Sequence, residues 1–261
     1  MPLQIERGIT ARPFSVCIYG PPKIGKTTWA SKAPGVLFLR TEDRLDHIDA
    51  DKLPLCKSWR DVLDQLGQVA KEDHEYKTLA FDSLTSMERL LHEHIARGVN
   101  KATIAEIDYG KGYVAAVNEF RRVLDGFTYL RDNRGMNIIA IGHSAIEKQE
   151  NPGEASFDRY MLDLNKHARA LVQQSFDNLF LAVEEVKTVE EKGGFGQKKN
   201  RAVGRVVKMI VSSTPRAVAG NSLSIQDEEA PFAFDWFAEA HRAFYAQPTT
   251  DGGKTDEKPH H

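Results

Sequence analysis

Residues 20–27 constrain this chain more than any other segment, because they place glycines and a Lys-Thr pair between an apolar run and a helical pattern. Their order is Gly, four residues, Gly, Lys, Thr, and the apolar run before them covers residues 15–19. Glycines let the backbone turn tightly, so that successive N–H groups point at phosphate oxygens. The helix that follows adds its free N–H groups and the positive end of its dipole. The segment therefore predicts a phosphate-binding loop in the strand–loop–helix context that this motif requires.

The residues of this loop have separate expected roles toward ATP. Lys26 is expected to reach the β- and γ-phosphates, the Thr27 hydroxyl to bind Mg²⁺, and Thr28 to contact the α-phosphate. Lys23 either lies over the γ-phosphate or faces water, and the sequence favours water. The predicted nucleotide-binding set is Gly20, Pro21, Pro22, Lys23, Ile24, Gly25, Lys26, Thr27 and Thr28.

A second apolar run, residues 78–82, ends in the carboxylate of Asp82. An aspartate at the end of such a strand can hold magnesium through a bound water. Alone, the pattern is also typical of a residue that caps the next helix. Together with the phosphate-binding loop it predicts that Thr27 and Asp82 handle the metal.

Apolar runs alternate with helical patterns along most of the chain, which is typical of a mainly parallel sheet in an α/β fold. Residues 144–160 are polar and irregular, so we expect a loop there. Glycines and cations at 192–201 predict a hairpin tip. The expected strands are 15–19, 36–39, 78–82, 137–142, 179–183 and 205–211, and the expected helices begin near 26, 58, 83, 113, 164 and 235.

Composition excludes several classes of protein. No run approaches the ~20 apolar residues that a membrane span requires, and residues 1–12 lack the apolar core of a secretory signal. A net charge of −2 argues against a globally basic coat for nucleic acid, but leaves room for a local basic groove. The two cysteines have neither metal-ligand nor disulfide spacing, which favours a reducing cytoplasm. We expect one domain over residues 1–246 and a disordered polar tail with a tag remnant over 247–261.

Taken together, the motifs resemble those of phage-encoded RecA-like ATPases that act as single-strand annealing proteins in recombination, with an AAA-like ATP-binding domain. The resemblance covers roughly residues 12–245. At the late motif such proteins carry a richer Lys/Arg cluster, whereas this chain has only Arg216. The motifs are Tyr-Gly-Pro-Pro-Lys-Ile-Gly-Lys-Thr-Thr (19–28), Leu-Arg-Thr-Glu (39–42), Ala-Phe-Asp-Ser (80–83), Tyr-Gly-Lys-Gly-Tyr (109–113), Ile-Ala-Ile-Gly-His (139–143) and Thr-Pro-Arg (214–216).

The resemblance implies a RecA-like P-loop core with a C-terminal antiparallel hairpin extension, assembled into rings or filaments with ATP between subunits. It implies that Glu42 polarises the attacking water, with Asp43 as a weaker alternate, and that His143 senses the γ-phosphate. Arg216 would stabilise charge on a neighbouring subunit's phosphoryl group. Each assignment has an alternative. Glu42 could belong to a solvated acidic loop, His143 could be a hydrogen-bonded residue at the rim of the sheet, and Arg216 could be a surface arginine in an ion pair. The expected catalytic set is Lys26, Glu42, His143 and Arg216.

The resemblance also implies single-stranded DNA as a partner, together with a single-strand DNA-binding protein, in the cytoplasm of a bacterial host. Single strands require cations for phosphates and flat side chains for bases, and two segments, 144–169 and 192–205, supply both. Either segment is otherwise an ordinary solvated loop. The candidate DNA-binding residues are Lys148, Arg159, Lys166 and Arg169 in the first segment, and Lys198, Lys199 and Arg201 in the second.

These observations favour a DNA-stimulated ATPase that promotes annealing or strand pairing. The alternative is a nucleotide-gated module that regulates or loads a replication protein with little hydrolysis. A small-molecule kinase is the weakest of the three, because the sequence has no arginine-rich lid segment.

Overall fold

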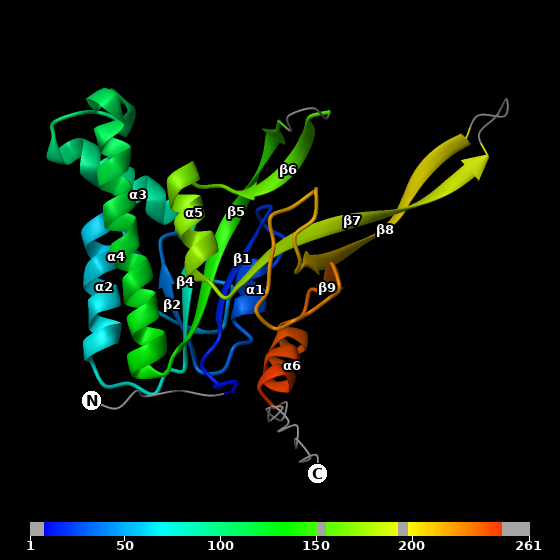
Figure 1. The fold of residues 1–261 in the computed structure, drawn as a ribbon, viewed down its shortest axis with the longest axis horizontal. Coiled ribbons are helices and arrows are strands. Elements are labelled where there is room, and N and C mark those ends of the chain that lie inside the picture. The colour runs from blue at the N-terminus through cyan, green and yellow to red at the C-terminus, as the bar shows by residue number, and fades with distance from the viewer. Residues whose placement is uncertain (1–7, 151–154, 193–197, 247–261) are drawn as a thin grey trace, which may run out of the picture.

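A single large sheet forms the centre of the protein (Figure 1). The computed structural model describes residues 8–150, 155–192 and 198–246, with side chains described outside 187–203. Its strands are β1 (Ser15–Gly20), β2 (Val36–Arg40), β3 (Asp51–Lys52), β4 (Thr78–Asp82), β5 (Asn137–Gln149), β6 (Phe157–Leu162), β7 (Asn178–Lys192), β8 (Lys198–Ile210) and β9 (Glu229–Pro231). Its helices are α1 (Lys26–Ala30), α2 (Trp59–Lys71), α3 (Leu84–Gly98), α4 (Lys111–Arg134), α5 (Lys166–Ser175) and α6 (Phe234–Tyr245), with short 3-10 turns at Ile104–Glu106 and Asp108–Gly110.

The strand order is β3-β2-β4-β5-β1-β7-β8-β9, with β6 paired to β5. All neighbours from β3 to β7 are parallel, whereas β8, β9 and β6 pair antiparallel. The expectation of a mostly parallel sheet with a C-terminal antiparallel extension is confirmed. Because ligands of parallel sheets bind beyond the carboxyl ends of the strands, this order directs attention to the ends of β1, β2, β4 and β5.

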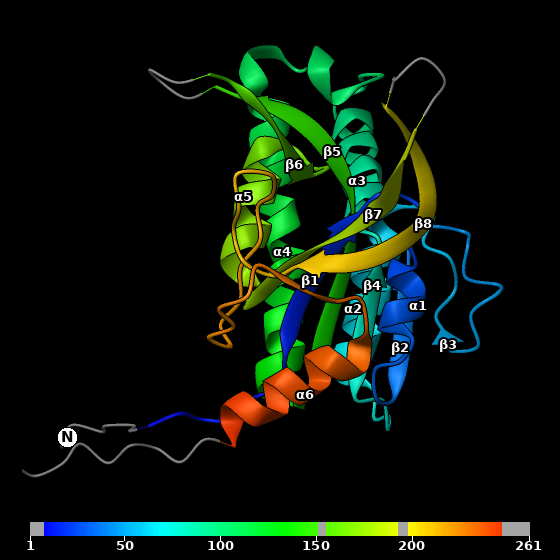
Figure 2. The same ribbon diagram turned by 90° about the vertical axis from the view of Figure 1, so that its right-hand side faces the viewer.

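Helices cover both faces of the sheet and create two separate cores. Cys17 and Tyr19 of β1 point into the core that α2, α3, α4 and α5 cover. Val16 and Ile18 point into the opposite core, beneath α1 and α6. Figure 2 shows α4 and α5 to one side of the central strands and α1 to the other. Both faces of the central strands are therefore buried, which explains why these strands read as continuous apolar runs.

Two serines begin helices at the places where the sequence predicts helix starts. Ser58 caps α2 in a reciprocal capping box with Asp61. The Ser83 side chain accepts from the Ser86 amide at the start of α3. Both contacts satisfy amides that have no partner inside the helix.

The expectation of a loop at residues 144–160 is wrong. β5 continues to Gln149, and β6 pairs with it from Ser144 opposite Leu162 to Gln149 opposite Phe157. This ribbon lies largely outside the core, and the outer residues of β5 are exposed. Strands without a buried face do not need apolar alternation, so the polar sequence conceals them.

The hairpin predicted around residues 192–201 is present as β7–β8, and its strands are much longer than expected. The strands pair from Leu181 opposite Ile210 to Lys192 opposite Lys198, with an irregularity at Lys187/Thr188. In Figure 1 this hairpin extends well beyond the remainder of the sheet. The backbones of the DNA-binding candidates Lys198, Lys199 and Arg201 lie in β8, but their side chains lie outside the described ones. The predicted tail at 247–261 also lies outside the described residues.

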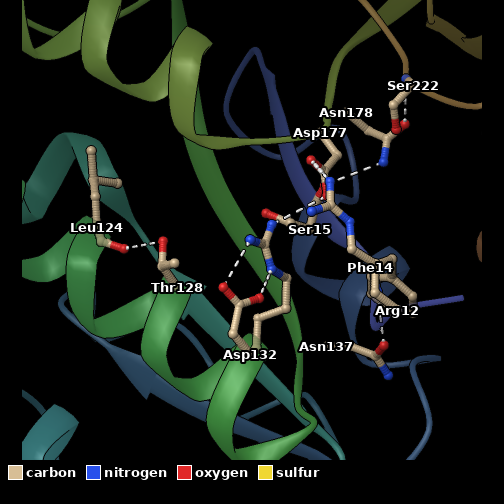
Figure 3. A network of polar contacts seen from close by, with 11 residues as sticks. Arg12, Phe14, Ser15, Leu124, Thr128, Asp132, Asn137, Asp177, Asn178 and Ser222 are labelled. Atoms are coloured by element: carbon tan, nitrogen blue, oxygen red, sulfur yellow. Dashed lines mark hydrogen bonds and ion pairs between the residues drawn. The ribbon is translucent and has the colours of Figure 1, made fainter. Parts of the chain in front are cut away.

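A polar network joins the starts of β1, β5 and β7 at the amino end of the sheet (Figure 3). The Asn137 side chain accepts from the Phe14 amide at 3.1 Å, and the Asn178 side chain donates to the Ser15 carbonyl at 3.2 Å. Arg12 pairs with Asp177 at 2.5 Å. These contacts fix three strands against each other far from the carboxyl ends.

Both cysteines are inside the protein. Cys17 lies within β1 and Cys56 follows β3, and neither is more than 2% exposed. Burial raises the pKa of the Cys17 thiol well above its usual range and that of Cys56 to about 12. Both thiols therefore behave as small apolar groups. Among the helices that the structure describes, none is long and apolar enough to cross a membrane.

Candidate nucleotide site

The predicted phosphate loop connects β1 to α1, as its sequence requires. A side chain at Gly20 would place its Cβ 2.5 Å from the Ala182 carbonyl oxygen. Gly25, which precedes α1, has a φ of +104°, a conformation that residues with a Cβ rarely adopt. Both glycines of the motif are therefore required by backbone geometry, and they hold the start of α1 toward the carboxyl ends of the strands.

Lys26 places a buried ammonium inside this loop. It is 5% exposed, and its Nζ donates to the carbonyls of Gly20 and Pro21, both at 2.8 Å. Burial lowers the pKa of Lys26 to about 8, although Asp82 and Glu42 act in the opposite direction. A desolvated ammonium of this kind is ready to exchange carbonyl contacts for the stronger charge-assisted contacts of phosphate oxygens.

Thr27 and Asp82 lie together at the next position of the site. The Thr27 Oγ1 donates to Asp82 Oδ2 at 2.8 Å across the ends of α1 and β4. Asp82 is 5% exposed, and burial raises the pKa of its carboxyl group while the Thr27 hydrogen bond lowers it. A hydroxyl and one carboxylate are the donor set that Mg²⁺ accepts when phosphates and waters complete its shell. The described residues contain no cluster of three or more His, Cys, Asp or Glu that could hold a metal ion.

Glu42 approaches the same site from the end of β2. The adjacent Thr41 fixes it there, because the Thr41 amide donates to the Asp82 carbonyl at 2.7 Å and its hydroxyl donates to the Ser83 carbonyl at 2.9 Å. The Glu42 carboxylate is 17% exposed. The turn after β2 thus rests directly on the end of β4.

Three donors converge on a single oxygen of Glu42. Its Oε1 accepts from Ser83 Oγ at 2.5 Å, from Ser86 Oγ at 2.9 Å, and lies 2.9 Å from His143 Nε2. The hydrogen bond with His143 is the largest influence, and with the two serines it lowers the pKa of Glu42 to about 2 against the opposing effect of burial. In this conformation Glu42 is a strongly hydrogen-bonded carboxylate rather than a poised base.

His143 lies on β5, between the strand that ends in Asp82 and the strand that leads into the phosphate loop. β5 separates β4 from β1, so that His143 is opposite Gly20 and Ile141 is opposite Asp82. The His143 amide donates to Thr85 Oγ1 at 3.0 Å. Its Nδ1 is buried without a hydrogen-bond partner in the part of the chain that the structure describes. This ring therefore has one nitrogen on Glu42 and one that remains free for a ligand or a water.

Two hollows meet at these side chains. A pocket of about 250 Å³ is lined by the phosphate loop, Asp82, Glu42 and His143, and extends to Arg44, Leu45 and His47. A wider groove of about 800 Å³ lies over the start of α3 and shares Pro22, Glu42, Arg44 and His143 with that pocket. The loop candidates Lys23 and Thr28 line the smaller pocket. The two hollows give a ligand on the phosphate loop an open side next to Glu42.

Thr85 and Ser86 are site residues that the sequence did not reveal, whereas Ser83 belongs to the motif at 80–83. Their pattern at a helix start predicts capping, and Ser83 does cap α3. The second function of Ser83 and Ser86, donation to Glu42, depends on the packing of β2 beside β4. No local sequence signal carries that information.

The remaining candidates lie away from this site. Arg216 is exposed in the loop after β8, and its carbonyl accepts from the Tyr160 amide at 2.8 Å. The Tyr19 hydroxyl donates to the Val218 carbonyl at 2.6 Å, which holds this loop on the sheet face opposite α1. Arg216 thus belongs to a loop on the sheet face opposite α1, and it lines neither of the two hollows.

Two of the DNA-binding candidates have internal partners. Arg159 donates through one nitrogen to Ser213, Thr214 and Ala217 at 3.0 to 3.1 Å. Arg169 is 7% exposed and forms a two-point contact with Glu147. We therefore assign both guanidinium groups to the packing of the chain, and Lys148 and Lys166 remain as the exposed cations of that segment.

A family model described as an AAA domain matches residues 12–223. The chain belongs to the AAA domain family. The AAA domain spans the phosphate loop, Glu42, Asp82, His143 and Arg216, and it ends before β9 and α6. A search of curated proteins gives no match. Family and geometry agree that this AAA protein is a P-loop ATPase.

Proposed function

We propose that this AAA ATPase hydrolyses ATP in response to single-stranded DNA and promotes annealing or strand pairing. The observation that supports this most directly is the 2.9 Å contact between Glu42 and His143. It joins a carboxylate beside the phosphate loop to the strand that continues into the β5–β6 ribbon. Such a contact gives a ligand at one end a means of influencing the other.

The expected chemistry is phosphoryl transfer to water. Lys26 and the loop amides would bind the phosphates, and Thr27 and Asp82 would hold Mg²⁺, which supplies charge neutralisation when bound. Glu42 would orient the attacking water after it leaves some of its present donors. His143 would report on the γ-phosphate through its contact with Glu42.

The proposed DNA contacts are cationic and exposed. Lys148 lies on β5 and Lys166 begins α5, both near the ribbon. We also include three cations of β8 on the ground of the sequence alone: Lys198, Lys199 and Arg201. Affinity carried by such cations should fall steeply with salt, because each phosphate contact releases counterions.

The proposed assembly is a ring or filament in which Arg216 acts on the phosphate of a neighbouring subunit. The exposure of Arg216, and its absence from the lining of both hollows, support this part of the proposal. A single-strand DNA-binding protein is the further partner that we propose, in the cytoplasm of a bacterial host.

A nucleotide-gated regulatory or loading module is the second candidate. The state of Glu42 favours it, because three donors on one oxygen and a pKa of about 2 make this carboxylate a weak base. If no partner releases Glu42, the protein would bind ATP and hydrolyse it slowly.

Phosphate release with and without single-stranded DNA separates the two candidates. We expect DNA to raise the rate for the wild type, Lys26→Ala to lose nucleotide affinity, and Glu42→Gln to bind ATP without turnover. Glu239→Gln, an exposed change on α6, is the matched control and should behave as wild type. A rate that ignores DNA, together with DNA affinity that is flat across salt, would favour the regulatory module.

A further inference from the structure

The first turns of α3 touch both the nucleotide site and the elements around the β5–β6 ribbon. Ser83 and Ser86 donate to Glu42, as described above, and Thr85 accepts from the His143 amide. Glu88, half a turn further along α3, points to a different element. One short stretch of helix therefore contacts the end of β2, the middle of β5 and the turn before α5.

Glu88 is a partly buried carboxylate that the proposed chemistry does not use. Its two oxygens accept the backbone amide of Asn165 at 3.0 and 2.9 Å. Asn165 caps α5 and ends the turn that leaves β6. Burial raises the pKa of Glu88 to about 7, and Asp163 adds to the effect while the Asn165 amide and Arg169 oppose it. The chain thus keeps a desolvated acid at the exit from the ribbon.

Arg169 continues this connection back to the ribbon itself. Its guanidinium donates to the Leu164 carbonyl at 3.0 Å, one residue before Asn165. It also forms the two-point contact with Glu147 on β5, at 2.8 and 2.5 Å. The Asp163 amide donates to the His143 carbonyl at 2.9 Å, which holds the same turn to β5 at the nucleotide end.

We infer that Glu88 is a positioning residue that ties the β5–β6 ribbon to α3, through Asn165, Arg169 and Glu147, so that release of Glu42 at the nucleotide changes the ribbon. We call these four residues the Glu88 relay. The inference rests on the proposed function only where it names DNA as what the ribbon meets. A ligand can shift such an arrangement only by binding its two states differently, and a γ-phosphate that competes for the donors on Glu42 meets that condition.

If Glu88 served packing alone, we would expect a neutral group at its position. A neutral side chain or a water can satisfy one backbone amide without desolvating a carboxylate, and burial of such a charge is unfavourable. The relay instead connects α3, whose first turn contacts Glu42 and His143, with Glu147 on the ribbon, and its contacts from Glu88 to Glu147 are within hydrogen-bond distance.

Hydrogen exchange of the β5 and β6 amides tests the relay without DNA. We expect Mg²⁺ and a non-hydrolysable ATP analogue to change exchange in the wild-type ribbon. In Glu88→Gln, which keeps an acceptor for Asn165, the change should shrink about threefold or more at unchanged nucleotide affinity. Glu239→Gln should retain the full change. A ribbon that does not respond to nucleotide, or that responds equally in Glu88→Gln, overturns the inference.

A double-mutant cycle with Glu147→Gln provides the second measurement. If the relay is one unit, the Glu88→Gln effect should largely disappear in the Glu147→Gln background, whereas independent roles would give additive effects and overturn it. Should Glu88→Gln fail to fold, Arg169→Lys interrupts the relay while keeping the charge, and it carries the same expectations. If the wild-type protein does not bind single-stranded DNA while its ribbon still responds to nucleotide, the proposed function is refuted and the inference about the relay is not.

Discussion

The two ends of the parallel strands are both polar, yet they use opposite chemistry. At the amino end, neutral amides of Asn137 and Asn178 bind backbone groups, and the charged pair of Arg12 and Asp177 lies toward the surface (Figure 3). At the carboxyl end, Lys26 and Asp82 are each 5% exposed, and burial lowers the pKa of Lys26 and raises that of Asp82. The same sheet therefore has one end that satisfies its polar groups and another that keeps desolvated charges beside an open pocket.

This difference separates stability from function. Satisfied neutral hydrogen bonds stabilise a fold modestly and have no further use. Buried charges with perturbed pKa values reduce stability unless a ligand neutralises them, and they cluster at functional sites. Mutations at the amino end should therefore change the stability of the protein, and mutations at the carboxyl end should change its activity.

The largest expected effect is that of Asp82→Asn. We expect hydrolysis to fall at least about 100-fold, because Asp82 is the carboxylate that we propose holds Mg²⁺ beside Thr27. The free protein should gain about 1 kcal/mol, since a neutral amide removes the cost of a buried carboxylate. Phosphate release and thermal unfolding without magnesium measure the two effects. A lower melting temperature for Asp82→Asn would contradict the comparison.

At the amino end, Asn178→Ala should have the reverse pattern. The side chain is 1% exposed and bridges the Ser15 carbonyl and the Ser222 amide. Loss of these partners should lower the free energy of unfolding by about 2 kcal/mol, the usual cost of unsatisfied buried groups. Chemical denaturation measures this change, and nucleotide affinity should stay at the wild-type value. A weakened affinity would mean that the two ends are not independent.

Glu88 gives the carboxyl side of the molecule a dependence on pH. Its folded-state pKa of about 7 is above the ordinary value of a glutamate, so the folded chain binds more protons than the unfolded chain between those values. Stability should therefore decrease as pH rises through this window, by on the order of 1 to 2 kcal/mol. Denaturation at pH 5 and pH 7.5 should show this loss in the wild type and a smaller loss in Glu88→Gln. Equal losses in the two proteins would show that Glu88 is not the titrating group.

The smallest expected effect belongs to Arg12→Ala. Arg12 has a side chain that is 45% exposed and pairs with Asp177 at 2.5 Å. Because water screens such pairs, the loss should be less than about 1 kcal/mol, and hydrolysis should not change. Thermal unfolding of Arg12→Ala and of Asn178→Ala compares how much the charged and the neutral contacts of the amino end contribute to stability. A larger loss for Arg12→Ala would reverse that ranking.

The sequence predicts those parts of the site that lie within one local motif. Gly25, Lys26 and Thr27 are specified by loop geometry, and Asp82 by the strand that it ends. The buried central strands are equally predictable from the sequence, because both of their faces must be apolar. The outer part of β5 and the start of β6 are not predictable in this way, since their residues are exposed or only half-buried.

Contacts between elements distant in sequence are the parts that could not be predicted. The convergence of Ser83, Ser86 and His143 on Glu42 joins residues up to 101 positions apart. Its geometry depends on which strands become neighbours. For the same reason, Arg159 and Arg169 read as free cations in the sequence, whereas packing supplies each with internal acceptors.

The two concealed thiols have a practical consequence for following the ribbon in solution. Because thiolate is the species that reacts with maleimides, Cys17 and Cys56 should remain unmodified in the folded protein at neutral pH. A Lys148→Cys substitution would then offer a fluorophore one selective attachment point on β5 without removal of either native cysteine. Emission from that dye during nucleotide addition would report ribbon displacement in real time, molecule by molecule.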